Sequence, residues 1–522
     1  MEEDLEKRKN KLKNKLFSWV KDNYDKVLII LLIVAFVIRI LIFLKTANQP
    51  LWWDEGDYLS AAKKWGLGLN IRDMWYYRRG FLWPAVSAIF FTLGLGEIGL
   101  RFFTVLLSTG LVALSYFIIA KMFDKKTALL VSIGMAFSWI SLFCTSRILT
   151  EIPATILLLL SLLFFWKGYV LKQGNKFLYF FGVLYALSLL VRFQFSMFAF
   201  PFLVFIFTRE KFKFLKNKHI WITVGLVFVV LLPFFIMYWT HYGNIFTDIL
   251  SHYFGVQGVS NNAGYLERTS ATLFNYFKDL PYMLTKSIFV LFILGVFLFF
   301  QDMIFGIDKI FKNEDIQKKL FVFLWIVVSF LVLGYITDYV EQRYILPTLP
   351  FIFLVAISPL IKLGDILNKY YQKISKRTAY ILSVLVLLLL LIFSFGNIQS
   401  NYSWANSLID MKLSSYSEIR QAGLWIKDNS NPEDVIISQS YPQITYYAER
   451  STYSPNYKGT GISGLEEMIN ELKPKYYMLS AIERSEDWTY TYPQNNSDLV
   501  PVWIYPQDSQ QPSLIIYEFK YS

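Results

Sequence analysis

A series of apolar runs is the feature that most constrains the fold of this chain. Each run is long enough, or nearly long enough, to cross the hydrocarbon core of a bilayer as a helix. The runs cover residues 27–44, 81–96, 101–120, 127–144, 149–166, 177–191, 193–208, 220–240, 284–300, 320–337, 346–361 and 380–397. Because 55% of the 522 residues are hydrophobic and only 17% are charged, the sequence predicts an α-helical polytopic membrane protein.

The net charge of +12 does not indicate a nucleic-acid partner. The basic residues form short clusters between apolar runs, which is typical of loops on the cytoplasmic side of a membrane. The single cysteine, Cys144, lies in an apolar run and excludes an intrachain disulfide and a thiolate metal site. The three histidines lack the spacing of a metal motif.

The distribution of Lys and Arg predicts which runs cross the membrane. If all runs crossed, basic clusters would lie on both sides, and the conflict begins at 81–96, which is short and contains Pro84. Treating 81–96 as an interfacial or re-entrant segment removes the conflict. The basic short segments then lie inside, at 1–26, 121–126, 167–176, 209–218, 309–319 and 362–377. We therefore expect about 11 transmembrane helices, a cytoplasmic N-terminus and an extracytoplasmic C-terminus in an integral, multi-pass protein of the cell membrane.

Three regions follow from this topology. Residues 1–26 form a cytoplasmic basic arm, and residues 27–399 a transmembrane domain whose first outer loop spans 45–100. Residues 400–522 have a polar composition without a spanning run, which predicts a small extracytoplasmic α/β domain. Its expected helices are 416–428 and 465–472, and its expected strands are 435–438, 476–479 and 514–519.

The first outer loop contains three acids beside the membrane, Asp54, Glu55 and Asp57. A charge near a bilayer is costly unless it faces water or a partner, so acids at this place indicate a functional site. A carboxylate there can act as a general base, and neighbouring acids that point in different directions can divide deprotonation and positioning. The alternative is helix capping by Asp54 or Asp57, which explains one acid and accounts adequately for Asp57.

A further acid, Glu151, lies at the start of an apolar helix, four residues after Arg147 and two before Pro153. The spacing places Arg147 and Glu151 on one helix face, so a local ion pair is one explanation. The other is that Glu151 reaches the same outer cavity as Asp54, where a helix N-terminus stabilises an anion.

Arginines accompanied by aromatic residues lie on the same predicted outer side, as Arg78-Arg79 and as Arg343-Tyr344. Arginine binds phosphate oxygens through two parallel hydrogen bonds. Each could instead contact lipid headgroups or anchor the chain at the interface. A cavity with acids on one wall and arginines on another suits a phosphate leaving group beside a base that activates a nucleophile.

Together these residues resemble a known pattern. An outer loop that opens with Asp54-Glu55, an acid at Glu151 after an arginine, the late segment Arg343-Tyr344-x-Leu346-Pro347-x-x-Pro350 and an outer C-terminal domain are similar to the GT-C membrane glycosyltransferases. The branch that holds protein O-mannosyltransferases and the lipid A aminoarabinose transferase is the most similar, over residues 27–397.

The resemblance implies a polyprenyl-phosphate-linked sugar donor, loss of the lipid phosphate and inversion at the anomeric carbon. It implies Asp54 as the base or as the carboxylate that orients the acceptor, with Glu55 and Glu151 shaping the position of the acceptor or of a metal. The carboxylates of Asp54 and Glu151 would suit a divalent cation, Mg or Mn. It also implies that Arg343, with Tyr344 beside it, and Arg78 or Arg79 hold the donor phosphate. Relatives often have lysine or histidine where this chain has Arg78-Arg79-Gly80, and aspartate where it has Glu151.

Two other classes of function remain open from the sequence. A lipid or glycolipid transporter or flippase would have polar groups near the bilayer midplane, whereas the polar residues here lie at helix ends. A noncatalytic glycan-binding protein is suggested only by the outer domain. A protein hydroxyl, a lipid and a glycan all fit as acceptors, and the sequons at Asn401 and Asn495 lie on the predicted outer side.

Overall fold

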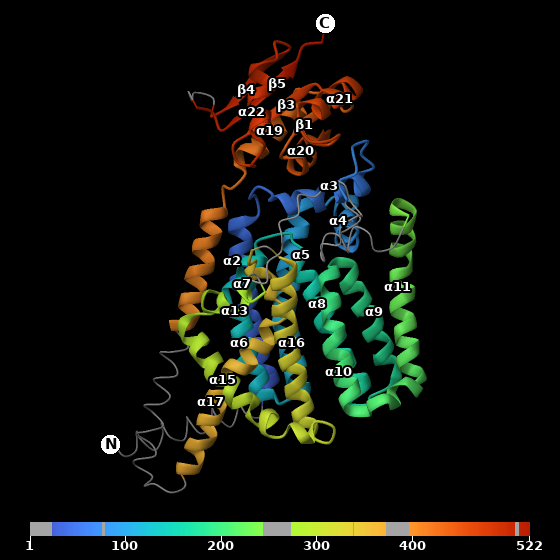
Figure 1. The fold of residues 1–522 in the computed structure, drawn as a ribbon. Coiled ribbons are helices and arrows are strands. Elements are labelled where there is room, and N and C mark those ends of the chain that lie inside the picture. The colour runs from blue at the N-terminus through green and yellow to red at the C-terminus, as the bar shows by residue number, and fades with distance from the viewer. Residues whose placement is uncertain are drawn as a thin grey trace, which may run out of the picture.

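The computed structural model describes residues 23–75, 79–243, 273–337, 339–371, 396–506 and 511–521. A long bundle of helices carries a small α/β unit at one end, and two short helices, α3 and α4, lie between them (Figure 1). We call the elements from Ser417 to Phe519 the C-terminal unit.

The bundle is built from helices of very different lengths. Its longer members are α2 (Tyr24–Thr46), α5 (Gly96–Met122), α6 (Lys125–Phe137), α8 (Glu151–Phe165), α9 (Asn175–Val191), α10 (Ala199–Glu210), α11 (Lys218–Tyr242), α15 (Lys286–Phe305), α16 (Glu314–Ile336) and α17 (Leu349–Tyr371). Shorter elements connect them: α7 (Trp139–Thr145), η1 (Trp166–Val170), η2 (Phe193–Phe198), η3 (Lys211–Lys216), α13 (Asn275–Lys278), α14 (Leu280–Met283), η5 (Ile307–Lys309) and η6 (Gln342–Ile345).

Among the described residues, seven helices are long and apolar enough to cross a membrane. The count rises to eight if α6 and α7, which meet at an angle of 53°, form one broken span. The expected spans at 177–191 and 193–208 correspond to α9 and to η2 followed by α10, and each of these helices is shorter than the seven counted above. Most of the expected span at 380–397 lies outside the described residues. The total of about 11 spans therefore stays a prediction.

The run at 81–96, expected to be interfacial or re-entrant, forms α4 (Leu82–Thr92), a helix of 11 residues. This length is well below the ~20 residues that a transmembrane helix needs. It packs beside α3 (Trp53–Leu67), near the C-terminal unit (Figure 1).

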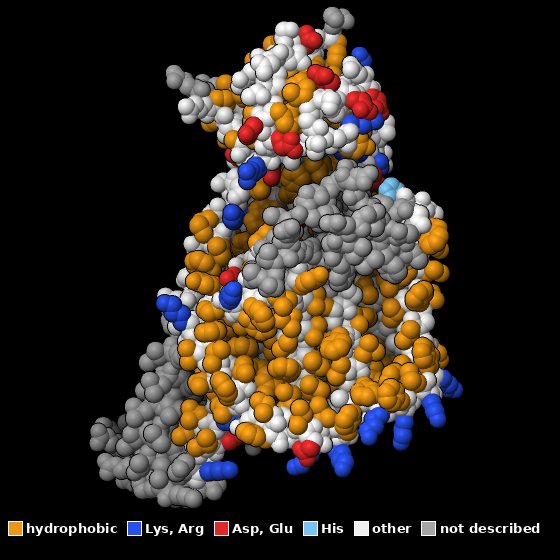
Figure 2. All heavy atoms as spheres, in the orientation of Figure 1, with side chains coloured by type: hydrophobic (Ala, Val, Ile, Leu, Met, Phe, Trp, Pro, Cys, Tyr) orange, Lys and Arg blue, Asp and Glu red, His pale blue; other side chains and the backbone are white. Residues whose placement is uncertain are grey.

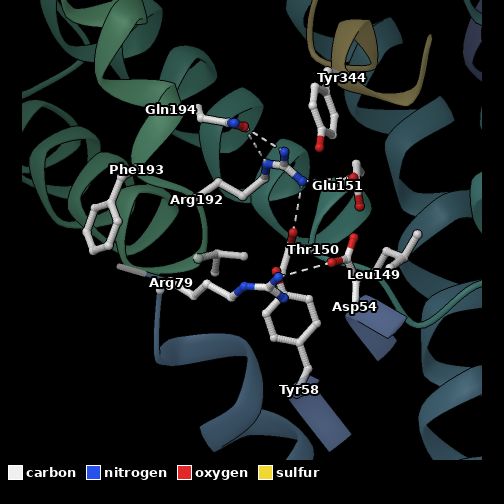
Figure 3. Close-up of a pocket in the computed structure, with 12 residues that line it drawn as sticks. Asp54, Tyr58, Arg79, Leu149, Thr150, Glu151, Arg192, Phe193, Gln194 and Tyr344 are labelled. Carbon is white, nitrogen blue, oxygen red and sulfur yellow. Dashed lines mark hydrogen bonds and ion pairs between the residues drawn. The ribbon is translucent and has the colours of Figure 1, made fainter. Parts of the chain in front are cut away.

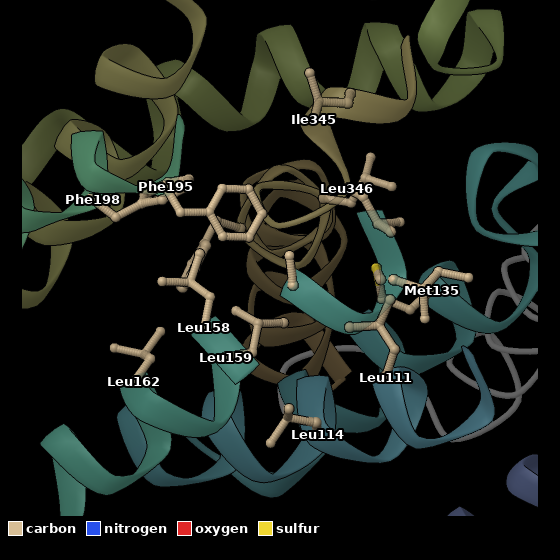
Figure 4. Close-up of a cluster of buried hydrophobic side chains, with 14 of the residues drawn as sticks. Leu111, Leu114, Met135, Leu158, Leu159, Leu162, Phe195, Phe198, Ile345 and Leu346 are labelled. Carbon is tan, nitrogen blue, oxygen red and sulfur yellow. The ribbon is translucent and has the colours of Figure 1, made fainter. Parts of the chain in front are cut away.

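The core of the bundle is formed where α5, α6 and α8 meet η2 and η6. Figure 4 shows side chains from these elements converging, among them Leu111, Met135, Leu158, Phe198 and Leu346. All five side chains are buried. This packing fixes η2, which contains Gln194, and η6, which contains Arg343 and Tyr344.

The outside of the bundle is apolar. Figure 2 shows hydrophobic side chains over the bundle and Lys and Arg side chains along the edge farthest from the C-terminal unit. Phe228 and Val229 of α11 are 63% and 64% exposed. An apolar surface of this extent is suited to contact with lipid, as expected for an integral membrane protein.

The C-terminal unit contains a five-stranded sheet in the order β2-β1-β3-β5-β4. Strand β1 is parallel to β2 and β3, whereas β5 is antiparallel to β3 and β4. The strands are β1 (Val435–Ser438), β2 (Ser451–Tyr453), β3 (Tyr476–Ser480), β4 (Leu499–Tyr505) and β5 (Leu514–Phe519). The helices are α19 (Ser417–Asp428), α20 (Tyr441–Ala448), α21 (Ile462–Leu472) and α22 (Asp487–Thr491), with η7 (Tyr492–Gln494).

The two sequons differ in accessibility. Asn401 is buried, its Oδ1 accepts a hydrogen bond from the backbone N–H of Trp139 at 3.2 Å, and its Nδ2 donates to the carbonyl of Asn397 at 2.9 Å. Asn495 is exposed. Only the second sequon therefore presents an accessible amide in this fold.

Candidate active site

Helix α3 begins with Trp52 as its N-cap residue, which leaves Asp54, Glu55 and Asp57 in its first two turns. The Glu55 carboxylate accepts a hydrogen bond from the Trp52 N–H at 2.8 Å, so Glu55 satisfies one of the free donors at the helix start. The expectation that Asp54 or Asp57 caps this helix is therefore wrong. Asp57 is 2% exposed, and its Oδ2 lies 3.0 Å from Nη1 of Arg79.

Glu55 connects α3 to the turn that precedes α8. Its Oε1 accepts from the Ile148 N–H at 2.7 Å, and its Oε2 lies 3.2 Å from Nη1 of Arg147. Both charged side chains are fully or almost fully buried, and the guanidinium of Arg147 stacks on the Trp52 ring at 4.0 Å. Arg147 thus pairs with Glu55 and not with Glu151. Neither Glu55 nor Arg147 lines the cavity described next.

A cavity of about 170 Å³ opens beside α3 at the end of the bundle near the C-terminal unit. Figure 3 shows its polar side chains pointing toward one another from separate elements. They are Asp54 and Tyr58 from α3, Arg79 before α4, Thr150 and Glu151 at the start of α8, Arg192 and Gln194 between α9 and α10, and Tyr344 from η6.

Two ion pairs join Asp54 to arginines from different parts of the chain. Its Oδ1 lies 3.1 Å from Nη2 of Arg79, and its Oδ2 lies 3.2 Å from Nη2 of Arg343. The Nε of Arg343 is also 3.3 Å from Oε1 of Glu151 and 3.0 Å from Oε2 of Glu341. Arg343 therefore links the first outer loop to the start of α8.

Arg192 lines another side of the cavity. Its Nη1 lies 2.8 Å from Oε1 of Glu151 and donates to Oγ1 of Thr150 at 2.9 Å, while its Nη2 donates to Oε1 of Gln194 at 2.6 Å. Its guanidinium also lies over the Tyr344 ring, 4.6 Å from the ring centre. Glu151 is 3% exposed and so holds Arg192 and Arg343 with a buried carboxylate.

These arginines decide the protonation state of Asp54. Burial raises the pKa of Asp54, but the positive charges of Arg79 and Arg343 outweigh burial, so the pKa lies below its ordinary value. Burial raises the pKa of the nearby Tyr58 to about 12. At neutral pH the cavity therefore presents an ionised carboxylate beside a protonated phenol.

A narrower pocket that adjoins the cavity retains unused hydrogen-bonding capacity. Its lining includes Arg343, Glu151 and Thr155, whose Nη1, Oε2 and Oγ1 atoms are buried and have no hydrogen-bond partner among the described residues. A buried guanidinium donor without a partner is costly, so a bound group would complete its hydrogen bonds. Arg79 and Arg192 line the cavity and Arg343 lines the adjoining pocket, and a group of arginines fits an anion such as a phosphate.

The donor set does not fit the divalent cation considered from the sequence. Arg343 bridges the carboxylates of Asp54 and Glu151, which were the expected ligands. Within the described residues, no group of three or more His, Cys, Asp or Glu side chains is arranged to hold a metal ion.

The structure brings together Asp54, Arg79, Glu151, Arg343 and Tyr344, as the sequence predicted. Arg78 lies outside the described residues. Arg192 and Gln194 were recognisable as polar residues on the outer side of two apolar runs, but their spacing indicated no role. Thr150 and Tyr58 carried no signal in the sequence, because a single hydroxyl is common in loops and short helices.

One part of the chain matches the profile of a known protein family. The sequence profile of the dolichyl-phosphate-mannose-protein mannosyltransferase family matches residues 78–239. No protein with a curated description matches the chain.

Solved structures match almost the whole fold. ArnT from Cupriavidus metallidurans, solved bound to undecaprenyl phosphate, is 12% identical with a TM-score of 0.63, and the match covers 94% of this chain and 97% of ArnT. The oligosaccharyltransferase of Archaeoglobus fulgidus, in its apo form, is 13% identical with a TM-score of 0.62, over 89% of this chain and 70% of that protein. The same archaeal enzyme, AglB, solved with an inhibitory peptide and a dolichol-phosphate, is 13% identical with a TM-score of 0.57, over 88% and 70%.

The overall fold is thus similar to those of ArnT and of the archaeal oligosaccharyltransferase. The profile match and the shared fold confirm the resemblance to protein O-mannosyltransferases and to the aminoarabinose transferase ArnT.

Proposed function

We propose that this chain is a glycosyltransferase that moves a sugar from a polyprenyl-phosphate-linked donor to an acceptor on the outer face of the membrane. The observation that carries the proposal is that Asp54 shares one cavity with Arg79 and Arg192 and forms an ion pair with Arg343, which lines the adjoining pocket. A base and a set of phosphate-binding cations at one place are what such a transfer requires.

In the proposed reaction, the Asp54 carboxylate accepts the proton of an acceptor hydroxyl. The acceptor oxygen then forms a bond to the anomeric carbon, and the bond between that carbon and the phosphate oxygen breaks. The electron pair of the broken bond leaves with the polyprenyl phosphate, whose growing charge is stabilised by Arg343 and Arg192. Attack opposite the leaving group inverts the anomeric centre.

The ion pairs of Asp54 give the donor a second role. A phosphate that binds Arg343 competes with Asp54 for the same guanidinium, which now lies 3.2 Å from the carboxylate. Because that arginine lowers the pKa of Asp54, its withdrawal toward the phosphate makes the carboxylate a stronger base. Donor binding would thereby activate Asp54 only when the leaving group is in place.

The remaining predicted site residues take supporting roles in this proposal. Glu151 orients Arg192 and Arg343, and Tyr344 covers Arg192 with its ring. Glu55, predicted from the sequence to be catalytic, is proposed to position α3 because its carboxylate is occupied by Ile148 and Arg147.

The orientation in the membrane is supported by charge. Lys and Arg side chains gather along the bundle edge opposite the C-terminal unit (Figure 2). Because cytoplasmic loops are enriched in these residues, that edge is proposed to face the cytoplasm. The cavity and the C-terminal unit then lie outside.

The transport alternative has less support in the structure. Arg39 is the charged residue buried within α2, and it donates to Oγ of Ser108 at 2.8 Å and Oγ of Ser141 at 3.0 Å and to the carbonyl of Ala136 at 3.1 Å. These contacts join α2 to α5 and to the bend between α6 and α7. The role of Arg39 in joining these helices explains why it is buried, without a role in transport.

The variant Asp54→Asn tests the assignment of the base. The substitution preserves size but removes proton-accepting ability, so transfer from a polyprenyl-phosphate sugar should fall by about 100-fold or more. The measurement is transfer of a labelled sugar by purified protein, with polyprenyl phosphate binding measured in parallel. Asp308→Asn, at an exposed position on η5, is the matched control and should transfer at the wild-type rate.

Full transfer by folded Asp54→Asn protein would contradict the assignment. Movement of a labelled lipid across proteoliposome membranes by the wild-type protein, without sugar transfer, would favour the flippase alternative.

A further inference from the structure

We propose that helix α20 of the C-terminal unit positions Asp54 by direct contact with α3, and that Gly56 is the residue that allows this contact. The inference rests on the proposed function of Asp54. It gives the C-terminal unit a part in catalysis.

One face of α3 is held by α20 along its length. Residues 53, 56, 60 and 63 are three or four positions apart and so share a helix face. The edge of the Trp53 ring packs on Tyr441, with 5.0 Å between ring centres, and Oγ of Ser60 donates to the carbonyl of Pro442 at 2.8 Å. Nζ of Lys63 lies 2.6 Å from Oε1 of Glu449, the residue after α20.

Gly56 marks the closest approach of the two helices. A Cβ atom added there would lie 2.9 Å from the backbone N of Gln443 and 3.0 Å from the carbonyl carbon of Pro442. Both neighbours are backbone atoms and cannot rotate away as a side chain would. Glycine weakens a helix interior relative to alanine, so its presence in the first turns of α3 is explained by this approach.

A neighbouring side of α3 carries the groups that face the cavity and Arg79. Asp54 meets Arg79, from the segment before α4, and Arg343, from η6, which packs against α7 and α16 of the bundle. A displacement of α3 from α20 would therefore move Asp54 relative to Arg343. Alignment of a reacting group matters, because a misplacement of about 1 Å can cost on the order of 100-fold in rate.

The C-terminal unit also holds the chain on both sides of α3. The Leu51 N–H donates to the Tyr447 hydroxyl at 2.8 Å before the helix. After the helix, the Arg72 guanidinium stacks on the rings of Tyr453 and Tyr457, 4.6 and 4.4 Å from their centres. The unit thus fixes the position of the whole segment that carries Asp54.

The experiment compares Gly56→Ala with Gly225→Ala in the full-length protein. Gly225 also lies in a helix, α11, but an added Cβ there meets no atom of the described residues within 4 Å. Gly56→Ala should bind polyprenyl phosphate within about twofold of wild type while its kcat for transfer falls at least about tenfold. Gly225→Ala should match wild type in both measurements.

The pH profile separates positioning from loss of structure. The charged and titratable groups that face Asp54 are Arg79, Arg192, Arg343, Glu151, Tyr58 and Tyr344. Moving Asp54 away from Arg343 should shift the acid limb of kcat/KM to higher pH in Gly56→Ala. Folded Gly56→Ala protein with the wild-type kcat and an unshifted acid limb would overturn the proposal.

A second variant covers the case in which Gly56→Ala does not fold. Ser60→Ala with Lys63→Gln removes two contacts to α20 and its flank without a clash, and should change kcat and the acid limb in the same direction by a smaller factor. An unchanged kcat and acid limb in this double variant would also overturn the proposal.

Failure of the proposed function would be seen separately, as absence of transfer by the wild-type protein. In that case amide hydrogen exchange tests whether α20 holds α3. The double variant should exchange amide hydrogens faster than wild type in Trp53–Leu67 but not in Glu151–Phe165. Unchanged exchange in α3 would show that these contacts do not hold the helix.

Discussion

At the scale of single residues, the cavity is organised by shared arginines. Arg343 contacts Asp54, Glu151 and Glu341, and Arg79 contacts Asp54 and Asp57. Each acid facing the cavity therefore has its charge balanced before any ligand binds. A phosphate entering the cavity has to compete with these carboxylates for the same donors.

This competition predicts different pH profiles for kcat/KM and kcat. The profile of kcat/KM reports the free enzyme, in which Arg79 and Arg343 hold the pKa of Asp54 below its ordinary value. The profile of kcat reports the donor complex, in which the phosphate has drawn Arg343 away. Because a carboxylate loses activity as pH falls through its pKa, the acid limb of kcat should lie at higher pH than that of kcat/KM. If the acid limbs of kcat and kcat/KM coincide, the bound phosphate does not draw Arg343 away from Asp54.

Much of this site was predictable from the sequence, and the reasons are chemical. Asp54, Glu151 and Arg343 are charged residues at the ends of apolar runs, where few roles other than function are available. The partners of each charge were not predictable. Arg147 and Glu151 have the spacing of an ion pair. In the structure, however, Arg147 pairs with Glu55 of α3, and Glu151 pairs with Arg192 and Arg343.

At the scale of elements, the turn between α7 and α8 joins the membrane bundle to α3. The buried pair of Glu55 and Arg147 ties this turn to the start of α3, and Arg147 also donates to the carbonyl of Lys412 at 3.1 Å. Below the turn, Arg101 donates to the carbonyls of Ser146 and Gln49 at 3.2 and 3.1 Å. The site is therefore assembled on a buried polar network.

Glu55→Gln tests the positioning role of this residue. Removing one partner of a buried ion pair leaves the other charge uncompensated, which costs about 3–5 kcal/mol. The variant should unfold at a clearly lower temperature in detergent, whereas Glu466→Gln, at an exposed position of α21, should not. Unchanged stability with loss of transfer would instead support the catalytic role that the sequence suggested for Glu55.

The observed secondary structure agrees with the prediction from the sequence where the pattern of apolar and polar residues is strong. Strands β1 and β5 occupy the predicted residues because short apolar runs are bounded there by polar ones. Strand β4 was missed because Pro501 lies within it, a residue tolerated at a sheet edge but a poor indicator of a strand. The bend between α6 and α7 was also hidden, because its apolar composition is continuous.

At the scale of the whole molecule, the single cysteine offers a direct test of orientation. Cys144 is buried in α7, so the unmodified protein should not react with a membrane-impermeant maleimide added to intact cells. A cysteine introduced by Asn495→Cys, in the C-terminal unit, should be labelled in intact cells. One introduced by Lys213→Cys, in η3 at the opposite edge, should be labelled only after the cells are opened. The reverse pattern would place the cavity on the cytoplasmic side.

The buried Nη1 of Arg343, which has no hydrogen-bond partner among the described residues, has a consequence for turnover. The group that leaves in the proposed reaction is a phosphate monoester, which carries more negative charge than the diester it came from. The product would therefore bind the arginines more tightly than the donor does, and its departure would limit the cycle. Added polyprenyl phosphate should then inhibit competitively against the donor in steady-state kinetics, and Arg343→Lys, which lacks the planar fork, should relieve this inhibition. Inhibition that is insensitive to Arg343 would show that the lipid chain, and not the phosphate, retains the product.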